Sequence, residues 1–482
     1  MNWRKLFLST SFATLLFSLI LILRIVFFQT PSTHPESNCF IMHYNSGEPL
    51  IKLIFDPLRT DWASFQAREL SYILDYIDAR FIFYCVQNHH AHFYSLSALI
   101  LLIASAALLH RKLKSLYPQA HPGVLLLPSL MYVCGFMNDT GFFRSSKPAV
   151  SFLLIWIFFT FAGILKTPEK YQSLRSHLSG ITALLLIPGF DRIGFFIAAV
   201  CAAAGAVLML IFSCDFSPED AGKRELFKKP LAIFSFAALA SVMISLVYNF
   251  AVAPVIIESL NGYYPSFKYQ TFQSTPGNFV DGLLFILKNY GGFFLPERDN
   301  AAIVCGVLIT GLLTFASITI WKKDRKKWLI PLAWGGIFAA SVVCTGMMIA
   351  RHPMIPTLPV GAYFQVFGTA LCGIFAIITL EQPKNKLRQI MAVIAITACL
   401  TPFFKAFFPG LQEPVHMQLH RATTAYTIEL LNNPEIPQTQ ILPTSSFELI
   451  KFFRNHEKTK NRGNFKSHSK NDKDGIAKSC KG

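Results

Sequence analysis

Charged residues are scarce in this chain. Asp, Glu, Lys and Arg make up only 15% of its 482 residues, whereas 52% are hydrophobic, 14% are aromatic and the mean hydropathy is +0.42. A soluble globule of this length needs more polar surface than this composition supplies. The composition therefore excludes a soluble enzyme and predicts an all-α protein that crosses a membrane many times.

Acidic residues are fewer than basic ones, 27 against 44, which leaves a net charge of +17. Such an excess can indicate a nucleic-acid partner. Here, however, Lys and Arg occur in short clusters between apolar segments and in one basic tail, a pattern typical of membrane topology. We therefore expect a lipid bilayer, and no nucleic acid, as the partner of these charges.

Metal-binding cysteine patterns are missing too. The ten Cys show no CxxC and no Cys/His metal spacing, and most lie inside apolar runs as small core residues. Cys39 and Cys85 flank the polar part of the first loop and could pair if that loop faces an oxidising compartment. The sequence leaves this pairing open.

A span needs about 20 apolar residues to cross about 30 Å of hydrocarbon, and this measure gives about eleven transmembrane helices. The first follows Arg4 and Lys5 and lacks a small-residue cleavage site, so we expect a retained anchor. The predicted spans are 6–28, 94–110, 122–137, 148–165, 178–190, 193–213, 231–257, 301–321, 328–350, 361–380 and 389–407.

Orientation follows from the basic connections. An inside N-terminus makes every second connection cytoplasmic, and these connections read "HRKLK", "KTPEKYQSLR", "KRELFKK", "KKDRKK" and "KNKLR". The prediction is therefore N-in and C-out. The short run 178–190 could instead be the first half of a broken helix continuing to 213, but merging the two would place "KRELFKK" outside.

The outer connections divide the chain further. Residues 1–407 would form the transmembrane domain, with a long first outer loop at 29–93 and a long fourth outer loop at 258–300. The fourth is rich in aromatics, and its segment "VDGLLFILKNYGG" predicts a surface helix. Residues 408–450 would be a small extracytoplasmic segment and 451–482 a basic, disordered tail. Any chemistry then belongs to loops at the outer face.

The stretch "RTDWASFQARELSYILDYIDARF" in the first outer loop is both charged and aromatic. As a helix over 62–81 it places apolar side chains on one side and acidic ones on the rest of its circumference, as expected for a helix lying in the membrane interface. The apolar side comprises Trp62, Phe65, Ile73, Ile77 and Phe81; the polar side comprises Gln66, Glu69, Asp75 and Asp78. Asp61 would either cap this helix or act as a general base beside Arg59 and Arg68.

This arrangement resembles the GT-C superfamily of integral-membrane glycosyltransferases, and most of all the branch of protein O-mannosyltransferases and aminoarabinose transferases. In that branch the first loop has Asp-Glu, an aromatic residue, and then Arg-Glu. Asp61 matches the first acid, Phe65 the aromatic residue, and Arg68 with Glu69 the Arg-Glu pair. Trp62 stands in place of the second acid. The late segment "RHPMIPTLP" is similar to the Arg-aromatic-Pro segment of bacterial members, with His352 in place of Tyr.

The resemblance implies an inverting transfer of a sugar from a polyprenyl-phosphate donor to a glycan, lipid or protein acceptor. It implies Asp61 as the base, Arg68 and Glu69 as loop supports, and a bacterial inner membrane with an extracytoplasmic active face. A departing phosphate needs cations in a partly dry site. The candidates in the outer connections are Arg144, Lys147, Arg192 and Arg351 beside His352. Snorkelling to the lipid surface is the alternative for each.

Two further acids could assist Asp61 or bind a divalent cation such as Mg²⁺ or Mn²⁺. Asp139 lies in the second outer loop and Asp191 in the third, and both are equally ordinary turn residues. Two alternatives to a glycosyltransferase stay open. One is a transporter or flippase of lipid-linked glycans, although charged mid-span residues and two-fold symmetry are not visible. The other is an O-antigen ligase or polymerase, which Arg351 and His352 would suit.

Overall fold

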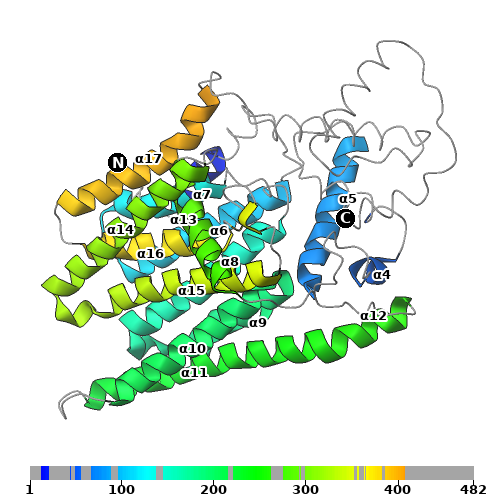
Figure 1. The fold of residues 1–482 in the computed structure, drawn as a ribbon, viewed down its shortest axis with the longest axis horizontal. Helices are drawn as coiled ribbons and strands as arrows, with labels where there is room; N and C mark the ends of the chain where they lie inside the picture. The colour runs from blue at the N-terminus through cyan, green and yellow to red at the C-terminus, as the bar shows by residue number, and fades with distance from the viewer. Residues whose placement is uncertain are drawn as a thin grey trace.

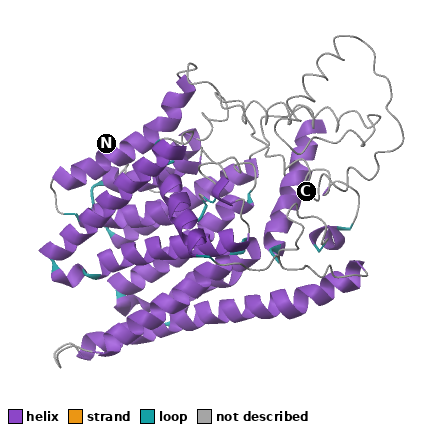
Figure 2. Cartoon of the chain, in the orientation of Figure 1, coloured by secondary structure: helices purple, strands orange, loops and turns teal. Residues whose placement is uncertain are grey.

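The computed structural model describes residues 12–20, 44, 49–55, 67–87, 96–136, 145–214, 221–261, 275–292, 294, 299–351, 355–357, 363, 365–382 and 386–407. Within these ranges every regular element is a helix (Figure 2). The predicted segments 408–450 and 451–482, Cys39 and the side chain of Cys85 lie outside them.

The helices form one bundle with an accessory group at one end (Figure 1). Residues 12–20 are helical, and Ala13 and Phe17 pack into the core. The longer helices are α5 (Glu69–Gln87), α6 (Leu96–Leu116), α7 (Pro122–Phe136), α8 (Ser146–Lys166), α9 (Leu174–Phe190), α10 (Ile193–Cys214), α11 (Ala221–Val247), α12 (Ala253–Asn261), α13 (Pro276–Gly291), α14 (Asp299–Lys323), α15 (Leu329–Arg351), α16 (Phe367–Glu381) and α17 (Lys386–Phe407). The short ones are α4 (Leu50–Ile54), η2 (Pro168–Tyr171), the π-helical turn η4 (Tyr248–Val252), η5 (Arg325–Lys327) and η6 (Ile355–Thr357).

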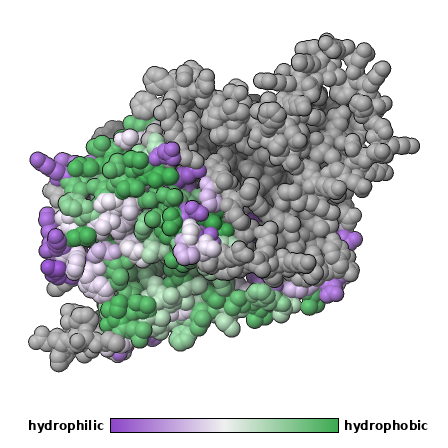
Figure 3. Space-filling view, viewed as in Figure 1, coloured by the Kyte–Doolittle hydropathy of each residue, from purple (hydrophilic) through white to green (hydrophobic). Residues whose placement is uncertain are grey.

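Six of these helical segments are long and apolar enough to cross a membrane. They are Leu96–Leu116, Ser146–Lys166, Ile193–Ser213, Leu226–Leu260, Asn300–Lys323 and Leu329–Ala350. Side chains such as Phe236, Leu308 and Leu210 point outward on them. In the space-filling view hydrophobic residues predominate on the visible face of the described bundle, and hydrophilic residues gather at its left end, where Figure 1 places the α14–α15 connection (Figure 3). The chain is thus built as a multi-pass membrane protein.

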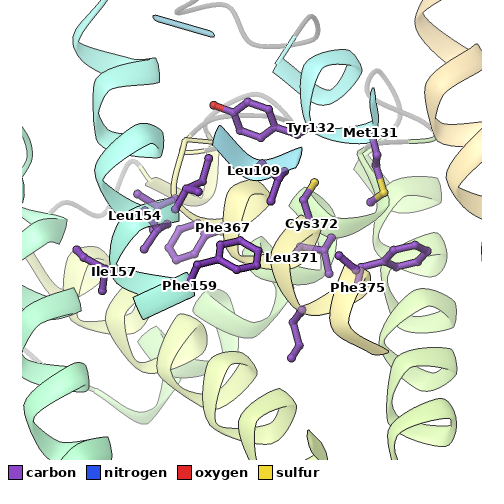
Figure 4. Close-up of a cluster of buried hydrophobic side chains, with 14 of the residues drawn as sticks. Leu109, Met131, Tyr132, Leu154, Ile157, Phe159, Phe367, Leu371, Cys372 and Phe375 are labelled. Carbon is purple, nitrogen blue, oxygen red and sulfur yellow. The ribbon is translucent and has the colours of Figure 1, made fainter. Parts of the chain in front are cut away.

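A cluster of buried side chains lies between α6, α7, α8 and α16. Leu109, Tyr132, Phe159, Phe367 and Leu371 meet there, and each is almost completely buried (Figure 4). Cys134, Cys344 and Cys372 are buried as free thiols, which confirms the expectation that cysteines in apolar runs serve as small core residues. The core therefore holds together helices that lie far apart in the sequence.

All five connections predicted to be cytoplasmic lie at one end of the bundle. The Glu381 carboxylate, at the end of α16, pairs with Lys166 Nζ at 3.0 Å and Lys327 Nζ at 2.8 Å. Lys166 also lies 3.2 Å above the ring of Tyr117, which follows α6. Gln172 Nε2 donates to the Leu226 carbonyl at 2.8 Å, which adds the start of α11. Their shared location supports the predicted alternation of connections.

Two predictions about local structure are decided. The runs 178–190 and 193–213 are two separate helices, α9 and α10, which turn sharply at Asp191. The segment "VDGLLFILKNYGG" does not lie on the surface along its whole length: α13 packs against α14 and α15, and its second half, from Phe285 to Gly291, is buried on all sides. Glycines permit this approach, because a Cβ on Gly291 would collide with the backbone of Ala302 and one on Gly282 with the backbone of Gly346.

Candidate functional site

The helix α5 lies at one end of the bundle, and α17, α14 and α16 extend toward the other end (Figure 1). Helix α5 runs across the direction of the long segment formed by α11, η4 and α12, as Figure 1 shows. At 1.5 Å per residue this segment is about 60 Å long, about twice the hydrocarbon thickness. Its far end packs with α4 and α5 in a separate apolar cluster of Ile54, Phe55, Ala67, Tyr72, Ala253 and Ile257.

The predicted start of this helix is wrong, because residues 67 and 68 are not helical and α5 begins at Glu69. An acidic residue in the first turn favours this start, since it complements the positive end of the helix dipole. Asp61 therefore does not cap α5. The predicted apolar side is confirmed for Ile73 and Ile77, whose side chains are 37% and 50% exposed.

The acidic side of α5 faces the protein interior. Asp78 is only 3% exposed, and its Oδ2 accepts hydrogen bonds from the Ser145 backbone N–H at 2.7 Å and from the Ser145 hydroxyl at 2.8 Å. Its Oδ1 accepts a bond of 2.5 Å from the Ser97 hydroxyl. One turn earlier, the Asp75 carboxylate accepts from the Ser146 hydroxyl at 3.3 Å. Two carboxylates thus join α5 to the starts of α6 and α8.

Burial and hydrogen bonding shift the pKa of Asp78 in opposite directions. Burial raises the pKa of Asp78 to about 6, although the hydrogen bonds from Ser97 and Ser145 lower it in part. The starts of α6 and α8 carry partial positive charge from their unpaired N–H groups, which favours a carboxylate there. Asp78 is therefore mainly ionised at neutral pH and titrates just below it.

The Arg-Glu pair stands at the beginning of α5 and reaches two other helices. Arg68 Nε donates to the Tyr72 hydroxyl at 3.3 Å, and the guanidinium lies 5.4 Å from the centre of that ring. Burial works against the charged form, but Tyr72, Asp191 and Asp75 hold the pKa of Arg68 above its ordinary value. Glu69 hydrogen-bonds with the hydroxyl of Tyr248, in the π-helical turn η4. The pair thus joins the start of α5 to the α9–α10 turn and to η4.

Asp191 has a local role as well as this electrostatic one. It is buried in the turn between α9 and α10, and its Oδ1 accepts the Ile193 N–H at 3.1 Å, at the start of α10. The neighbouring Arg192 is half-buried in the same turn. The connection between α9 and α10 therefore meets α5 through Asp191 and places Arg192 at the same end of the bundle.

Lys147 lies on another side of α8 from the serines that bind α5. Its Nζ lies 5.7 Å from the ring centre of Tyr363, which precedes α16. Tyr363 has φ of 63°, a left-handed conformation that is uncommon for a residue with a side chain. Its ring also contacts Phe285 of α13, with 6.4 Å between ring centres. Lys147 thus approaches the late part of the chain.

The described residues bring together part of the predicted set. Arg68, Glu69, Lys147, Asp191 and Arg192 lie at the same end of the bundle. The other predicted site residues fall outside the described part of the chain: Arg59, Asp61, Asp139, Arg144, His352 and the side chain of Arg351. The helix α15 does end at Arg351.

Sequence reasoning missed the partners of α5. Ser97, Ser145 and Tyr248 were not candidates, although "RSSKP" before an apolar run is a typical helix start and indicates capping serines. Nothing local identifies Tyr248 or the acid that Ser145 binds. Among the described residues no three His, Cys, Asp or Glu side chains are grouped as metal ligands, and the serines already occupy the carboxylates of Asp75 and Asp78.

Comparisons of the chain with protein-family models, with curated proteins and with solved structures found no match.

Proposed function

We propose that this chain is an inverting glycosyltransferase of the GT-C type. It moves a sugar from a polyprenyl-phosphate donor to an extracytoplasmic glycan, lipid or protein acceptor. The protein lies in a bacterial inner membrane with about eleven spans and a cytoplasmic N-terminus. The active face is the end of the bundle that carries α5.

The docking of α5 is the observation that supports this proposal most. The Arg68-Glu69 pair, which carries the resemblance, is held at the bundle end by Asp191 and Tyr248. Lys147 and Arg192 come from two other connections at that end. Two candidate phosphate contacts and the loop motif thus share one face, as a reaction that needs both a base and cations requires.

In the proposed reaction Asp61 removes the proton from the acceptor hydroxyl, whose oxygen forms the new bond to the anomeric carbon. The bond from that carbon to the donor phosphate breaks, and the phosphate leaves with its electron pair. Lys147, Arg192, Arg144 and Arg351 stabilise the negative charge that develops on the phosphate. Asp139 supports Asp61 or helps to hold a divalent cation such as Mg²⁺ or Mn²⁺.

The proposal is tested with the full-length protein in proteoliposomes supplied with a panel of labelled polyprenyl-phosphate sugars and envelope extracts. We expect transfer of the label with release of polyprenyl phosphate, and we expect Asp61→Asn to abolish both without changing expression or melting temperature. Glu169→Gln, an exposed acid in η2 at the other end of the bundle, is the matched control. Transfer that persists in Asp61→Asn would exclude Asp61 as the base.

The same vesicles distinguish a glycosyltransferase from the main alternative, a flippase. A flippase would move a labelled lipid-linked glycan between leaflets without breaking the bond from sugar to phosphate. Movement without release of polyprenyl phosphate would therefore reject the glycosyltransferase. Transfer measured with and without EDTA tells whether Mg²⁺ or Mn²⁺ is required.

A further inference from the structure

A second polar region lies beneath Lys147, where α8 meets the start of α16. The Ser151 hydroxyl donates to the Gln365 carbonyl at 2.9 Å, and the Thr369 hydroxyl contacts both that carbonyl at 2.9 Å and the Ser151 hydroxyl at 3.1 Å. Lys147 and Ser151 are four residues apart on α8, so they lie on the same side of that helix. We call this region, formed by Lys147, Ser151, Tyr363, Gln365 and Thr369, the α8–α16 seam.

The position of Gln365 within the seam is well defined. It stands between Tyr363, whose ring lies under the Lys147 ammonium, and Thr369, which binds Ser151. The seam continues inward to Tyr132, whose hydroxyl points away from the apolar cluster in Figure 4 and lies near Ser151. Gln365 is thus part of a polar path leading from Lys147 into the bundle.

The side chain of Gln365 is fully buried, at 0% exposure. Within the described part of the chain neither its Nε2 nor its Oε1 has a hydrogen-bond partner. A buried amide without partners is strongly unfavourable, because it has lost its bonds to water and gained none. An apolar side chain of the same size would be more stable here. The presence of Gln therefore points to a ligand that uses the amide.

The charges around the seam define the chemistry of that ligand. Lys147 supplies a cation and the Gln365 amide supplies two N–H donors, a combination that suits phosphate oxygens. A negatively charged group in the seam would therefore meet N–H donors from both side chains.

We propose that the α8–α16 seam binds a phosphate monoester, with Gln365 donating to the phosphate and Lys147 neutralising it. This inference rests on the proposed function in one respect. The ligand expected is polyprenyl phosphate, because it is the group that leaves the donor in the proposed reaction. Free inorganic phosphate has the same chemistry. Gln365 is then a binding residue for the phosphate group.

The test measures binding to the full-length protein in detergent. Three ligands are titrated separately: polyprenyl phosphate, the polyprenol of the same chain length, and inorganic phosphate. Each is added to wild type, Gln365→Met and Gln365→Glu, and binding is followed by thermal shift and native mass spectrometry. Gln382→Met is the matched control: it is a buried Gln just beyond the other end of α16, whose Nε2 donates to the Ala316 carbonyl at 2.6 Å.

We expect Gln365→Met to melt at or above the wild-type temperature but to bind polyprenyl phosphate about tenfold more weakly or worse, since a hydrogen bond to a charged group is lost. Gln365→Glu should abolish binding by repulsion. Gln382→Met should melt lower and keep its affinity. Inorganic phosphate that binds the wild type as tightly as the lipid would identify free phosphate as the ligand and still support the seam.

Three results would overturn the inference. If Gln365→Met bound polyprenyl phosphate as tightly as the wild type does, the amide contact would be excluded. If the wild type bound polyprenol as tightly as polyprenyl phosphate, recognition of the phosphate would be excluded. A lower melting temperature in Gln365→Met would mean that the amide is structural. None of these measurements needs sugar transfer. A protein that binds phosphate through Gln365 and transfers no sugar would therefore refute the proposed function while supporting the seam.

Discussion

The carboxylate of Asp78 accepts both the backbone N–H and the hydroxyl of Ser145 on a single oxygen, at 2.7 and 2.8 Å. Its other oxygen is bound by Ser97. One side chain of α5 thus contacts the residues at the start of two bundle helices, α6 and α8. The position of α5, and with it that of Arg68 and Glu69, depends on this contact.

Asp78→Asn should stabilise the protein at neutral pH. The pKa of Asp78 in the folded protein, about 6, lies above its ordinary value of 3.8. The folded state therefore binds the proton more strongly, and the stability linked to protonation is lost as the pH rises through 6. Asn is neutral at every pH and keeps an acceptor for Ser145. We expect a gain of about 1 to 3 kcal/mol at pH 7.5 and a weaker dependence of melting temperature on pH between 5 and 7.5.

Melting curves of the full-length protein from pH 5 to 7.5 check this prediction. Asp281→Asn removes the same charge from an exposed position on α13 and should leave the pH dependence unchanged. Asp78→Ala should melt lower at all pH values, because the Ser145 N–H loses its acceptor. If Asp78→Asn melted as low as Asp78→Ala, the ionised carboxylate would be essential for the docking of α5.

Two glycines of α14 should respond in opposite ways to alanine. A Cβ on Gly306 would collide with the backbone carbonyl of Leu287 in α13, whereas a Cβ on Gly311 meets nothing within 4 Å. Backbone atoms cannot move aside as the end of a flexible side chain can. Gly306→Ala should therefore lower the free energy of unfolding by about 1 to 3 kcal/mol. Gly311→Ala should be neutral or slightly stabilising. Thermal melting of the two variants side by side decides this, and equal melting temperatures would contradict the close packing of α13 on α14.

The hydropathy pattern predicted the bodies of the helices because it reports a local property. The runs 94–110, 148–165 and 301–321, for example, fall on α6, α8 and α14. The basic connections also predicted which helix ends lie together, since charge excludes them from lipid. The contact of Glu381 with Lys166 and Lys327 agrees with this.

The pattern could not predict what each helix packs against. In α5 periodicity assigned Ile73 to the outward side, but it could not show that Asp78 is buried against the starts of α6 and α8. The packing of α13 depends on Gly282 meeting Gly346, two residues far apart in the sequence. The Gln365 amide was missed for the same reason, because its lack of partners depends on what α8 brings to it.

Arg351→Ala should weaken binding of the polyprenyl-phosphate donor. Arg351 ends α15, and a guanidinium bound to phosphate contributes a charged hydrogen bond, so we expect about a ten- to hundredfold loss of affinity. Lys322→Ala, at the other end of the α14–α15 pair, is the matched control. Titration of donor into proteoliposomes measures both variants. An unchanged apparent affinity in Arg351→Ala would remove Arg351 from the phosphate site.

Arg68 should support α5 rather than touch the substrate, and two substitutions separate these roles. Arg68→Met leaves Asp191 and Asp75 without their nearby cation, and removing one partner of a buried charge cluster is strongly destabilising, by about 3 to 5 kcal/mol. Arg68→Lys keeps the charge but loses the planar group that lies on Tyr72, so it should recover only part of the stability. If Arg68 acts only through the position of α5, transfer activity should follow melting temperature across wild type, Lys and Met. Normal melting in Arg68→Met together with lost transfer would instead assign Arg68 a direct contact with the donor or acceptor.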